Sequence, residues 1–479
     1  RIIAMADYPG FNLNDPRNTA SLIGMPVVDN NGVRTGESVT QEILDGLDDA
    51  AMYQQLNALW KNFCISYTYE PGSVSKPFTV AAALEDGAIK GTESYNCEGF
   101  LHVGDHDISC HQTFGDGTLT VQQGIERSCN VVLMNVAFKL GKDRFVDYQR
   151  LFGMGLKTNV DLAGEARTAS MVFTKDNIGP TDLATNSFGQ SFNATMIQMI
   201  TGFCSLINGG YYYEPHIVDK ITTADGATIE NIEPRVLKRT VSQATSDKVR
   251  EYCNTVVSGE KGTGKTARPA GYMIGGKTGT AETLPRGNDE YVVSFMGYAP
   301  VDDPQIAIYV VVDRPNIQYQ DNARQATGIV RNVLTEVLPY LNIYMTEELS
   351  DKEREELEAL QIQIRMADDV EDEPETDEEG NPVDPANPEG SGGDGGAGTG
   401  EDTPEEEQKV NDTWKSFPVD PESGYLKDPA TGYLYDPETG TRVDGGSLLG
   451  GEEEQEEGEE GTEEGEEGGD GDDEEEGGA

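Results

Sequence analysis

A serine and a lysine three residues apart, Ser73 and Lys76, have the side chains of a nucleophile and its base. Ser73 follows Pro71-Gly72 and opens a predicted helix over 73–88, on which residues three apart share one face. A serine hydroxyl needs a neighbouring base, and lysine can be that base only if burial or a nearby positive charge lowers its pKa. By itself the motif is more often a capping serine beside a solvated lysine.

Two further motifs carry compatible side chains. Ser128-Cys129-Asn130 falls in a predicted helix over 124–140, and a local break of that helix could aim Ser128 and Asn130 at one cleft, although a simple helix cap explains the motif equally well. Lys277-Thr278-Gly279-Thr280 lies on a predicted strand over 274–282. Its lysine and hydroxyls could bind a carboxylate and its strand edge an extended peptide, or it is a glycine-rich strand end with an exposed lysine.

The elements that must position these motifs predict an α+β domain with an antiparallel sheet flanked by helices. Residues 291–299 and 305–313 read as strands joined by a short proline-containing turn, which predicts a hairpin. Arg1–Tyr8 also reads as a strand and is expected to join this hairpin in one sheet. Further helices are predicted at 193–208 and 322–341, from their apolar periodicity.

Charge divides the 479 residues into two parts. The chain has 87 acidic and 35 basic residues, and residues 367–479 alone hold 41 of the acids and four of the bases. The pattern predicts a folded domain over 1–345, a charged helix over 346–368 and a disordered acidic tail over 369–479, with D-P-x-[ST]-G repeats at 420–440. No cluster of basic residues could neutralise phosphates, which argues against nucleic acid as a partner.

Six cysteines are spread through the predicted domain without a C-x-x-C pair. Cys97 and Cys110 flank a segment with hairpin-like turn residues, and the sequence leaves open whether they form a disulfide or remain free thiols. The other four, Cys129 among them, lie among apolar neighbours and are expected to be small core residues. Four zinc ligands cannot be assembled from the spacing, so no metal site is predicted.

The ends of the chain carry an expectation about the membrane. No stretch approaches 18 consecutive apolar residues, so no transmembrane helix or signal peptide is predicted in the sequence. The sequence begins at Arg1 and its first residues already read as the interior of a domain. We therefore expect an upstream part beyond this sequence.

The order of the three motifs resembles that of the penicillin-binding proteins and serine β-lactamases. The separations, 55 and then 149 residues, look like those of penicillin-binding proteins. The resemblance extends to Tyr69–Gly72, to Gly189-Gln190 and to Met296–Pro300, and it covers about residues 1–345. Cys129 and the segment between Cys97 and Cys110 look most like the monofunctional class B enzymes of Gram-positive bacteria, the septal and sporulation group.

The resemblance implies a transpeptidase fold with an all-helical subdomain beside the sheet. It also implies a peptidoglycan D,D-transpeptidase that cross-links stem peptides ending in D-Ala-D-Ala, is inhibited by β-lactams and acts in division or sporulation. No cofactor is implied. The implied place is the extracytoplasmic face of the cell membrane, with an anchor helix in the missing upstream part and division or sporulation membrane proteins as partners.

The resemblance assigns a role to each motif. Ser73 is the nucleophile, Lys76 takes its proton, and Ser128 and Asn130 relay that proton and orient Lys76 and the substrate. The oxyanion hole is formed by the backbone N–H groups of Ser73 and Thr280. The substrate's carboxylate is held by the third motif: Lys277, Thr278, Gly279 and Thr280.

Rival interpretations share these motifs. A D,D-carboxypeptidase, a penicillin sensor and a β-lactamase would use the same acyl-enzyme, and the acceptor, amine or water, separates cross-linking from trimming. A non-catalytic wall scaffold is the alternative outside enzymes, and acylation by a β-lactam would exclude it.

Overall fold

The computed structural model describes residues 1–29, 32, 34–367, 426–427 and 434–435. The chain divides into two compact units, Arg1–Glu375 and Thr376–Ala479. In the second unit β14 (Leu426–Lys427) pairs antiparallel with β15 (Leu434–Tyr435), eight residues further on. The rest of the predicted acidic tail, 369–479, and of its repeats lies outside the described residues.

A three-stranded antiparallel sheet forms the centre of the first unit, in the order β11 (Gly275–Glu282), β12 (Tyr291–Ala299) and β13 (Ile306–Asp313). The predicted hairpin is confirmed as β12–β13. The prediction of a strand over Arg1–Tyr8 is wrong. Residues 1–7 form no strand, and Ile2 donates its N–H to the carbonyl of His216, 2.8 Å away, instead of joining the sheet.

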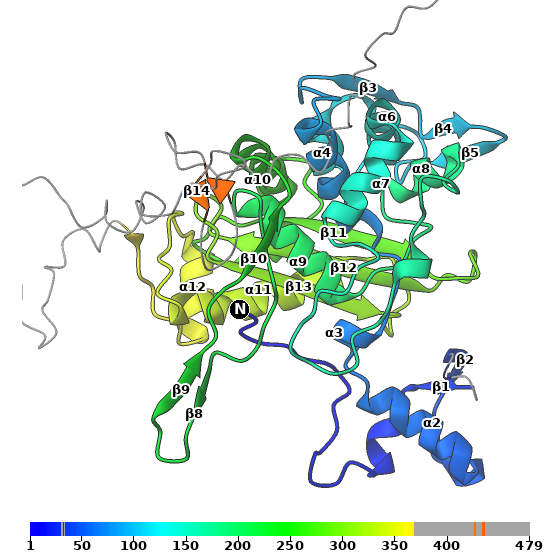
Figure 1. Ribbon diagram of the computed structural model, residues 1–479, viewed down its shortest axis with the longest axis vertical. Coiled ribbons are helices and arrows are strands. Elements are labelled where there is room, and N and C mark those ends of the chain that lie inside the picture. The colour runs from blue at the N-terminus through cyan, green and yellow to red at the C-terminus, as the bar shows by residue number, and fades with distance from the viewer. Residues whose placement is uncertain (30–31, 33, 368–425, 428–433, 436–479) are drawn as a thin grey trace, which may run out of the picture. The chain divides into compact units, whose positions relative to one another are not determined.

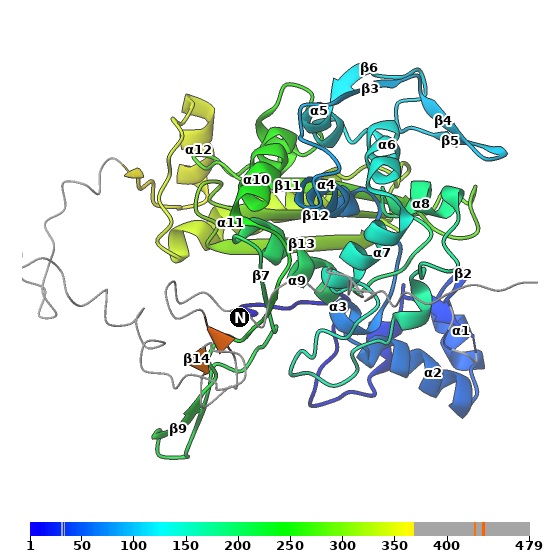
Figure 2. The ribbon, with the colours of Figure 1, turned by 45° about the horizontal axis from the view of Figure 1, so that its top comes forward.

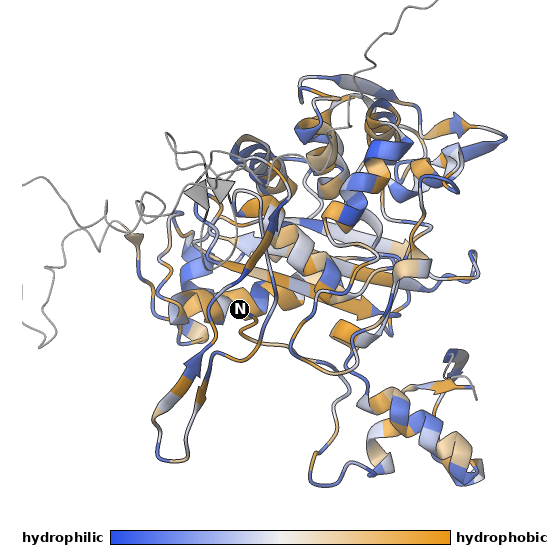
Figure 3. Cartoon of the chain, viewed as in Figure 1, coloured by the Kyte–Doolittle hydropathy of each residue, from blue (hydrophilic) through white to orange (hydrophobic). Residues whose placement is uncertain are grey.

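Helices cover both faces of this sheet (Figures 1 and 2). Successive side chains of β12 point to opposite faces, so they pack in two different hydrophobic cores. Met296 and Tyr298 pack with α9 (Met196–Ile207) and α10 (Gln243–Ser258). Phe295 and Ala299 pack with α11 (Arg324–Tyr340). The strands are accordingly apolar along much of their length (Figure 3). Burial on both faces holds the edge strand β11, which carries the third motif, in a fixed place.

A mainly helical subdomain lies beside the sheet. Its helices are α4 (Lys76–Glu85), α5 (Val121–Glu126), α6 (Asn130–Leu140), α7 (Lys142–Leu151) and α8 (Pro180–Asn186). It is not all-helical as expected, since residues 94–120 form two antiparallel strand pairs. These are β3 (Ser94–Cys97) with β6 (Gly117–Thr120), and β4 (Phe100–Val103) with β5 (His106–Ser109).

The N-terminal residues form a small lobe with its own apolar core. The lobe contains η1 (Thr19–Leu22), β1 (Pro26–Val28), β2 (Arg34–Ser38), α1 (Gln41–Gly46) and α2 (Asp49–Trp60). The buried residues of its apolar cluster are Leu22, Val39, Leu44, Leu56 and Leu59. The short helix α3 (Phe63–Ser66) leads from this lobe towards the nucleophile motif.

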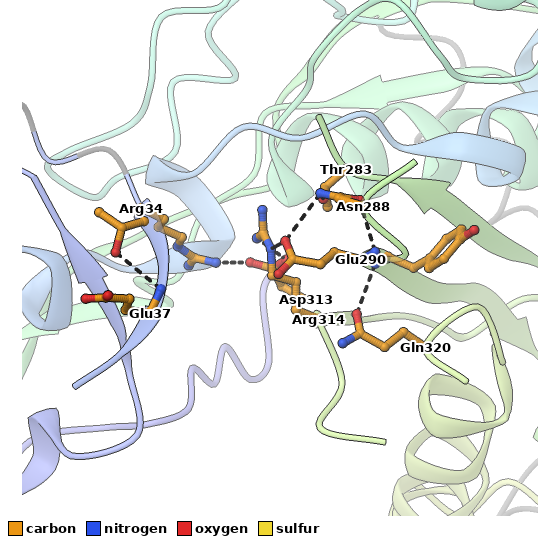
Figure 4. Close-up of polar contacts among 10 residues, drawn as sticks. Arg34, Glu37, Thr283, Asn288, Glu290, Asp313, Arg314 and Gln320 are labelled. Atoms are coloured by element: carbon orange, nitrogen blue, oxygen red, sulfur yellow. Dashed lines mark hydrogen bonds and ion pairs between the residues drawn. The ribbon is translucent and has the colours of Figure 1, made fainter. Parts of the chain in front are cut away.

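Arg34 connects this N-terminal lobe to the end of the central sheet (Figure 4). Its guanidinium pairs with Asp313, the last residue of β13, and lies 5.0 Å from the centre of the Tyr67 ring. The next residue, Arg314, pairs with Glu290 at 2.7 Å. A row of alternating charges therefore runs from the lobe to the loop that precedes β12.

The remaining elements complete the first unit. Two peripheral antiparallel pairs are β7 (Tyr211–Tyr213) with β10 (Val236–Arg239), and β8 (Lys220–Thr222) with β9 (Thr228–Asn231). Single turns of 3-10 helix are η2 (Gly72–Ser75), η3 (Ala169–Met171) and η4 (Lys265–Ala267). The segment predicted as a charged helix contains α12 (Asp351–Ala359). Among the described residues, no helix combines the length and apolar character needed to cross a membrane.

Candidate active site

Ser73 lies on the 3-10 turn η2, immediately before α4. In this turn Lys76 donates its backbone N–H to the carbonyl of Ser73, and residues three apart in a 3-10 helix share one face. Gly72 has φ +62°, and a Cβ there would lie 2.6 Å from the carbonyl oxygen of Thr280. The absent side chain lets the nucleophile turn pack directly against β11.

Lys76 is fully buried and its ammonium group has three oxygen partners. Nζ donates to the Ser128 carbonyl at 2.6 Å, to Ser128 Oγ at 3.0 Å and to Asn130 Oδ1 at 2.8 Å. Burial lowers the pKa of Lys76 to about 8, because the charged form loses its hydration. In a substantial fraction of the molecules, Lys76 is therefore neutral slightly above pH 7.

The second motif lies at a break between two helices, as the sequence suggested. α5 ends at Glu126 and α6 begins at Asn130. Ser128 between them has φ +61°, a left-handed conformation that costs a non-glycine residue energy and is found where function requires it. This turn directs the Ser128 hydroxyl and the Asn130 amide oxygen to the same lysine.

The third motif presents a second buried ammonium group. Lys277 Nζ donates to Ser128 Oγ at 3.0 Å, so this hydroxyl lies between two lysines. Burial, and then the charge of Lys76, hold the pKa of Lys277 well below its usual value. The exposed lysine of the alternative interpretation is not found, since Lys277 is fully buried.

β11 is an edge strand, and its Gly279 permits close contact with Ser294 of β12 and with Pro71. A Cβ at Gly279 would lie 2.3 Å from Ser294 Oγ and 3.1 Å from the carbonyl oxygen of Pro71. Thr278 is buried and Thr280 is partly exposed. An edge strand next to a nucleophile can accept an extended substrate by backbone pairing.

The sequence analysis gave no individual role to Thr263, Glu70 or Arg286, which lie close to this site. Thr263 Oγ1 lies 2.8 Å from Thr278 Oγ1. Glu70 accepts a hydrogen bond from the Ser191 backbone N–H at 2.9 Å and pairs with Arg286 of the β11–β12 loop. The partners of Glu70 lie 121 and 216 residues further along the chain, and Thr263 lies 15 residues before Thr278, so no motif spacing indicates these pairs.

Of the four cysteines expected in the core, Cys64, Cys129 and Cys253 are buried and Cys204 is half-buried. All six are free, so the Cys97–Cys110 disulfide that the sequence left open is not formed in the structure. Cys129 is a core residue whose Sγ lies 3.7 Å from Cys110 Sγ, and the hydrogen bond between the two thiols lowers the pKa of Cys110. Four possible metal ligands, Cys97, Cys110, Cys129 and Asp116, nevertheless converge, which their spacing in the sequence did not indicate.

Taken together, the three motifs surround one point with the groups that acyl transfer requires. A serine, a buried lysine with a lowered pKa, a hydroxyl shared by two ammonium groups and an open strand edge come from separate parts of the chain. This combination suits attack on a carbonyl next to a carboxylate.

Comparison with known proteins gives a family match over most of the first unit. The model of the penicillin binding protein transpeptidase domain matches residues 4–335. A second family model, the OCRE domain, matches residues 415–458, which include all of the D-P-x-[ST]-G repeats at 420–440.

Individual relatives agree with the first match. Stage V sporulation protein D of Bacillus subtilis is 35% identical, over 62% of this chain and 46% of its own length. Penicillin-binding protein PbpB of Mycolicibacterium smegmatis is 31% identical, over 53% of this chain and 40% of its own. The chain thus spans less than half the length of these relatives.

Solved structures resemble the fold. Penicillin binding protein 3 of Mycobacterium tuberculosis complexed with aztreonam superposes with a TM-score of 0.55 at 27% identity, covering 62% of this chain and 68% of that one. The same protein complexed with ampicillin gives a TM-score of 0.55 at 26% identity, with the same coverage.

Proposed function

The chain belongs to the penicillin-binding protein transpeptidase family, and on that premise we propose that it is a peptidoglycan D,D-transpeptidase that cross-links stem peptides through a serine acyl-enzyme. The observation that carries the proposal is the position of Lys76, which is buried one 3-10 turn after Ser73 and hydrogen-bonded to Ser128 and Asn130. A lysine held in this way can accept a proton near neutral pH.

In the first step, Ser73 Oγ attacks the carbonyl carbon of the penultimate D-Ala of a stem peptide. The serine proton passes to neutral Lys76, and the negative charge that forms on the carbonyl oxygen is stabilised by the backbone N–H groups of Ser73 and Thr280. The contact between Gly72 and the Thr280 backbone supports this assignment. Each such donor contributes about 3–4 kcal/mol in comparable sites.

In the second step, the bond between the two D-Ala residues breaks and the terminal D-Ala leaves. Its nitrogen receives the proton from Lys76 by way of the Ser128 hydroxyl, which is 3.0 Å from Lys76 Nζ. Asn130 orients Lys76 and the substrate amide. The terminal carboxylate is held by Lys277, Thr278 and Thr280 while the peptide pairs with the edge of β11, at Gly279.

In the third step, an amine of a neighbouring stem peptide attacks the ester carbonyl, forms the cross-link and releases Ser73. β-Lactams are expected to acylate the same serine and to leave slowly. Support comes from the solved relative of Mycobacterium tuberculosis, whose structures are complexes with aztreonam and ampicillin.

We place this domain on the extracytoplasmic face of the cell membrane, because peptidoglycan is assembled there. Division or sporulation membrane proteins are the partners we expect. Support comes from the relatives' names, which include a stage V sporulation protein and a peptidoglycan D,D-transpeptidase FtsI homolog.

The first test is covalent labelling with a fluorescent penicillin. We expect Ser73→Ala to abolish the labelled band, because the nucleophilic oxygen is removed. Ser75→Ala is the matched control: Ser75 is buried on the same turn, and its Oγ has no hydrogen-bond partner among the described residues. Persistent labelling of Ser73→Ala would remove Ser73 from its role.

The second test separates cross-linking from trimming. The unaltered protein is incubated with a D-Ala-D-Ala donor peptide and an amine acceptor, and the products are analysed by mass spectrometry. We expect the donor–acceptor amide. A protein that released only D-Ala and the shortened acid, at every acceptor concentration, would be a carboxypeptidase.

A further inference from the structure

Three cysteines and one aspartate meet beside the second motif, although they come from four separate segments. Cys97 ends β3, Cys110 follows β5, Asp116 precedes β6 and Cys129 lies between α5 and α6. Their sulfur atoms and one carboxylate oxygen all lie within 4.8 Å of one another. The cysteines are buried and the aspartate is half-buried.

We propose that Cys97, Cys110, Cys129 and Asp116 bind one Zn²⁺ ion as a structural centre. The distance between two of the sulfur atoms fits this ion. Zinc–sulfur bonds of about 2.3 Å at a tetrahedral angle place two sulfur atoms about 3.8 Å apart. Cys110 Sγ and Cys129 Sγ are 3.7 Å apart, whereas a disulfide would require about 2.05 Å.

The types of ligand also select zinc. Three thiolates are soft ligands, which favour zinc over the hard cations magnesium and calcium. Four protein ligands complete a tetrahedron and leave no position for a reacting molecule, as in structural rather than catalytic zinc sites. The centre would therefore hold the fold together and take no part in bond-making.

Second-sphere contacts of the expected kind are in place. The backbone N–H of Asn130 donates to Cys110 Sγ at 3.3 Å. Arg127 lies 3.6 Å from Asp116 and offsets part of the negative charge of four anionic ligands. Such outer contacts orient ligands and stabilise thiolates in zinc proteins.

Two glycines bring the ligand-bearing loops together. The carbonyl oxygen of Gly99 accepts a hydrogen bond from the backbone N–H of Cys110 at 2.7 Å. Gly115 has φ +82°, and a Cβ there would lie 2.4 Å from the carbonyl oxygen of Cys97. The end of β3 and the loop before β6 can therefore lie in contact, which places Cys97, Cys110 and Asp116 on one side of the second motif.

The position of Cys129 in the second motif indicates what the proposed zinc centre would stabilise. Cys129 is bonded directly to Ser128 and Asn130, the two residues that contact Lys76. Ser128 is held in a left-handed conformation that an isolated turn would not favour. Zinc would fix this turn to β3, β5 and β6. The binding of zinc does not depend on the proposed transpeptidase activity.

Metal analysis of the full chain tests the centre. Protein purified with zinc present and dialysed against metal-free buffer should retain about one zinc per chain. Replacement by Co²⁺ should give the intense near-ultraviolet sulfur-to-cobalt absorption that thiolate ligands produce. The protein without metal should also unfold at a lower temperature.

Two ligand variants and one control make the test specific. Cys97→Ser and Asp116→Asn should each weaken zinc binding more than about tenfold in a competition titration, since each removes one ligand. Cys204→Ser changes a cysteine of α9 outside the cluster and should retain zinc fully. Ser73→Ala should also retain it, which keeps this test separate from the test of acylation.

Two results would overturn the proposal. One is a folded, unaltered chain that holds less than about a tenth of an equivalent of zinc. The other is a Cys110–Cys129 disulfide found in peptide mass maps of protein prepared with zinc and without oxygen. If neither ligand variant folds, the zinc content and cobalt spectrum of the unaltered chain still decide.

Discussion

The Ser128 hydroxyl is 3.0 Å from the ammonium nitrogens of both Lys76 and Lys277. Two positive charges so close to each other, and away from water, are costly, so one lysine readily gives up its proton. A carboxylate bound beside Lys277 would favour its charged form. Substrate binding would then assign the charge to Lys277 and leave Lys76 neutral as the base.

This arrangement predicts how acylation depends on pH. Lys76 accepts the serine proton only when neutral, and burial lowers its pKa to about 8. The rate of acylation by a β-lactam should therefore rise about tenfold per pH unit below that pKa and level off above it. Stopped-flow measurements between pH 6 and 9.5 would show the rise. A flat profile over that range would contradict Lys76 as the base.

At the level of single residues, the sequence could predict most of the candidate catalytic groups, because each motif is local. Ser73 and Lys76 share a turn, and Ser128 and Asn130 share a break. Glu70 with Arg286, and Cys97 with Cys129, could not be paired in this way. Their proximity depends on how distant loops pack, and no spacing rule in one sequence encodes that.

Among the elements, those with strong periodicity were predicted well. β12 was predicted to the residue, and α11 was placed within two residues at each end. The predicted strand at Arg1–Tyr8 failed because its apolar residues pack elsewhere: Ile2 and Met5 contact a cluster that contains Cys64 and Ile65. Alternation of apolar residues indicates burial, and burial does not require a neighbouring strand.

The contact between η2 and β11 predicts the effect of adding one methyl group. Gly72→Ala should destabilise the fold by about 1–3 kcal/mol, because φ is +62° and the new Cβ would meet the Thr280 carbonyl at 2.6 Å. It should also slow penicillin acylation strongly by moving the turn from the strand. Thermal unfolding and labelling rates would measure both effects.

A second glycine provides the control for this experiment. Gly328 lies within α11, and a Cβ there would have nothing within 4 Å. Gly328→Ala should therefore stabilise the protein by about 0.5–1 kcal/mol through helix propensity and leave labelling unchanged. If both variants behaved alike, the close approach at Gly72 would not matter.

On the scale of the whole chain, the net charge of −52 is mostly a property of the acidic tail. Residues 367–479 carry 41 acidic side chains and four basic ones, and the chain before them is only mildly acidic. The proposed active site lies within the first unit, Arg1–Glu375.

Truncation tests this division. Removal of residues 376–479 should leave the rate of penicillin acylation within about twofold of the full chain and should not lower the unfolding temperature, since every group assigned to the site precedes residue 330. The same assay on both proteins at one ionic strength would measure it. A large loss of labelling would make the tail part of the enzyme.

The row of charges that starts at Arg34 also sets a limit on communication between distant parts of the first unit. Any molecule that binds the N-terminal lobe more tightly when Arg34 is released from Asp313 must, by thermodynamic reciprocity, weaken that ion pair when it binds. Through this ion pair alone, such coupling cannot exceed what the pair is worth. Because both side chains are mostly buried, that is on the order of 1–3 kcal/mol, or roughly a 5- to 150-fold change in affinity. A partner on the lobe could therefore influence the end of the sheet through Arg34.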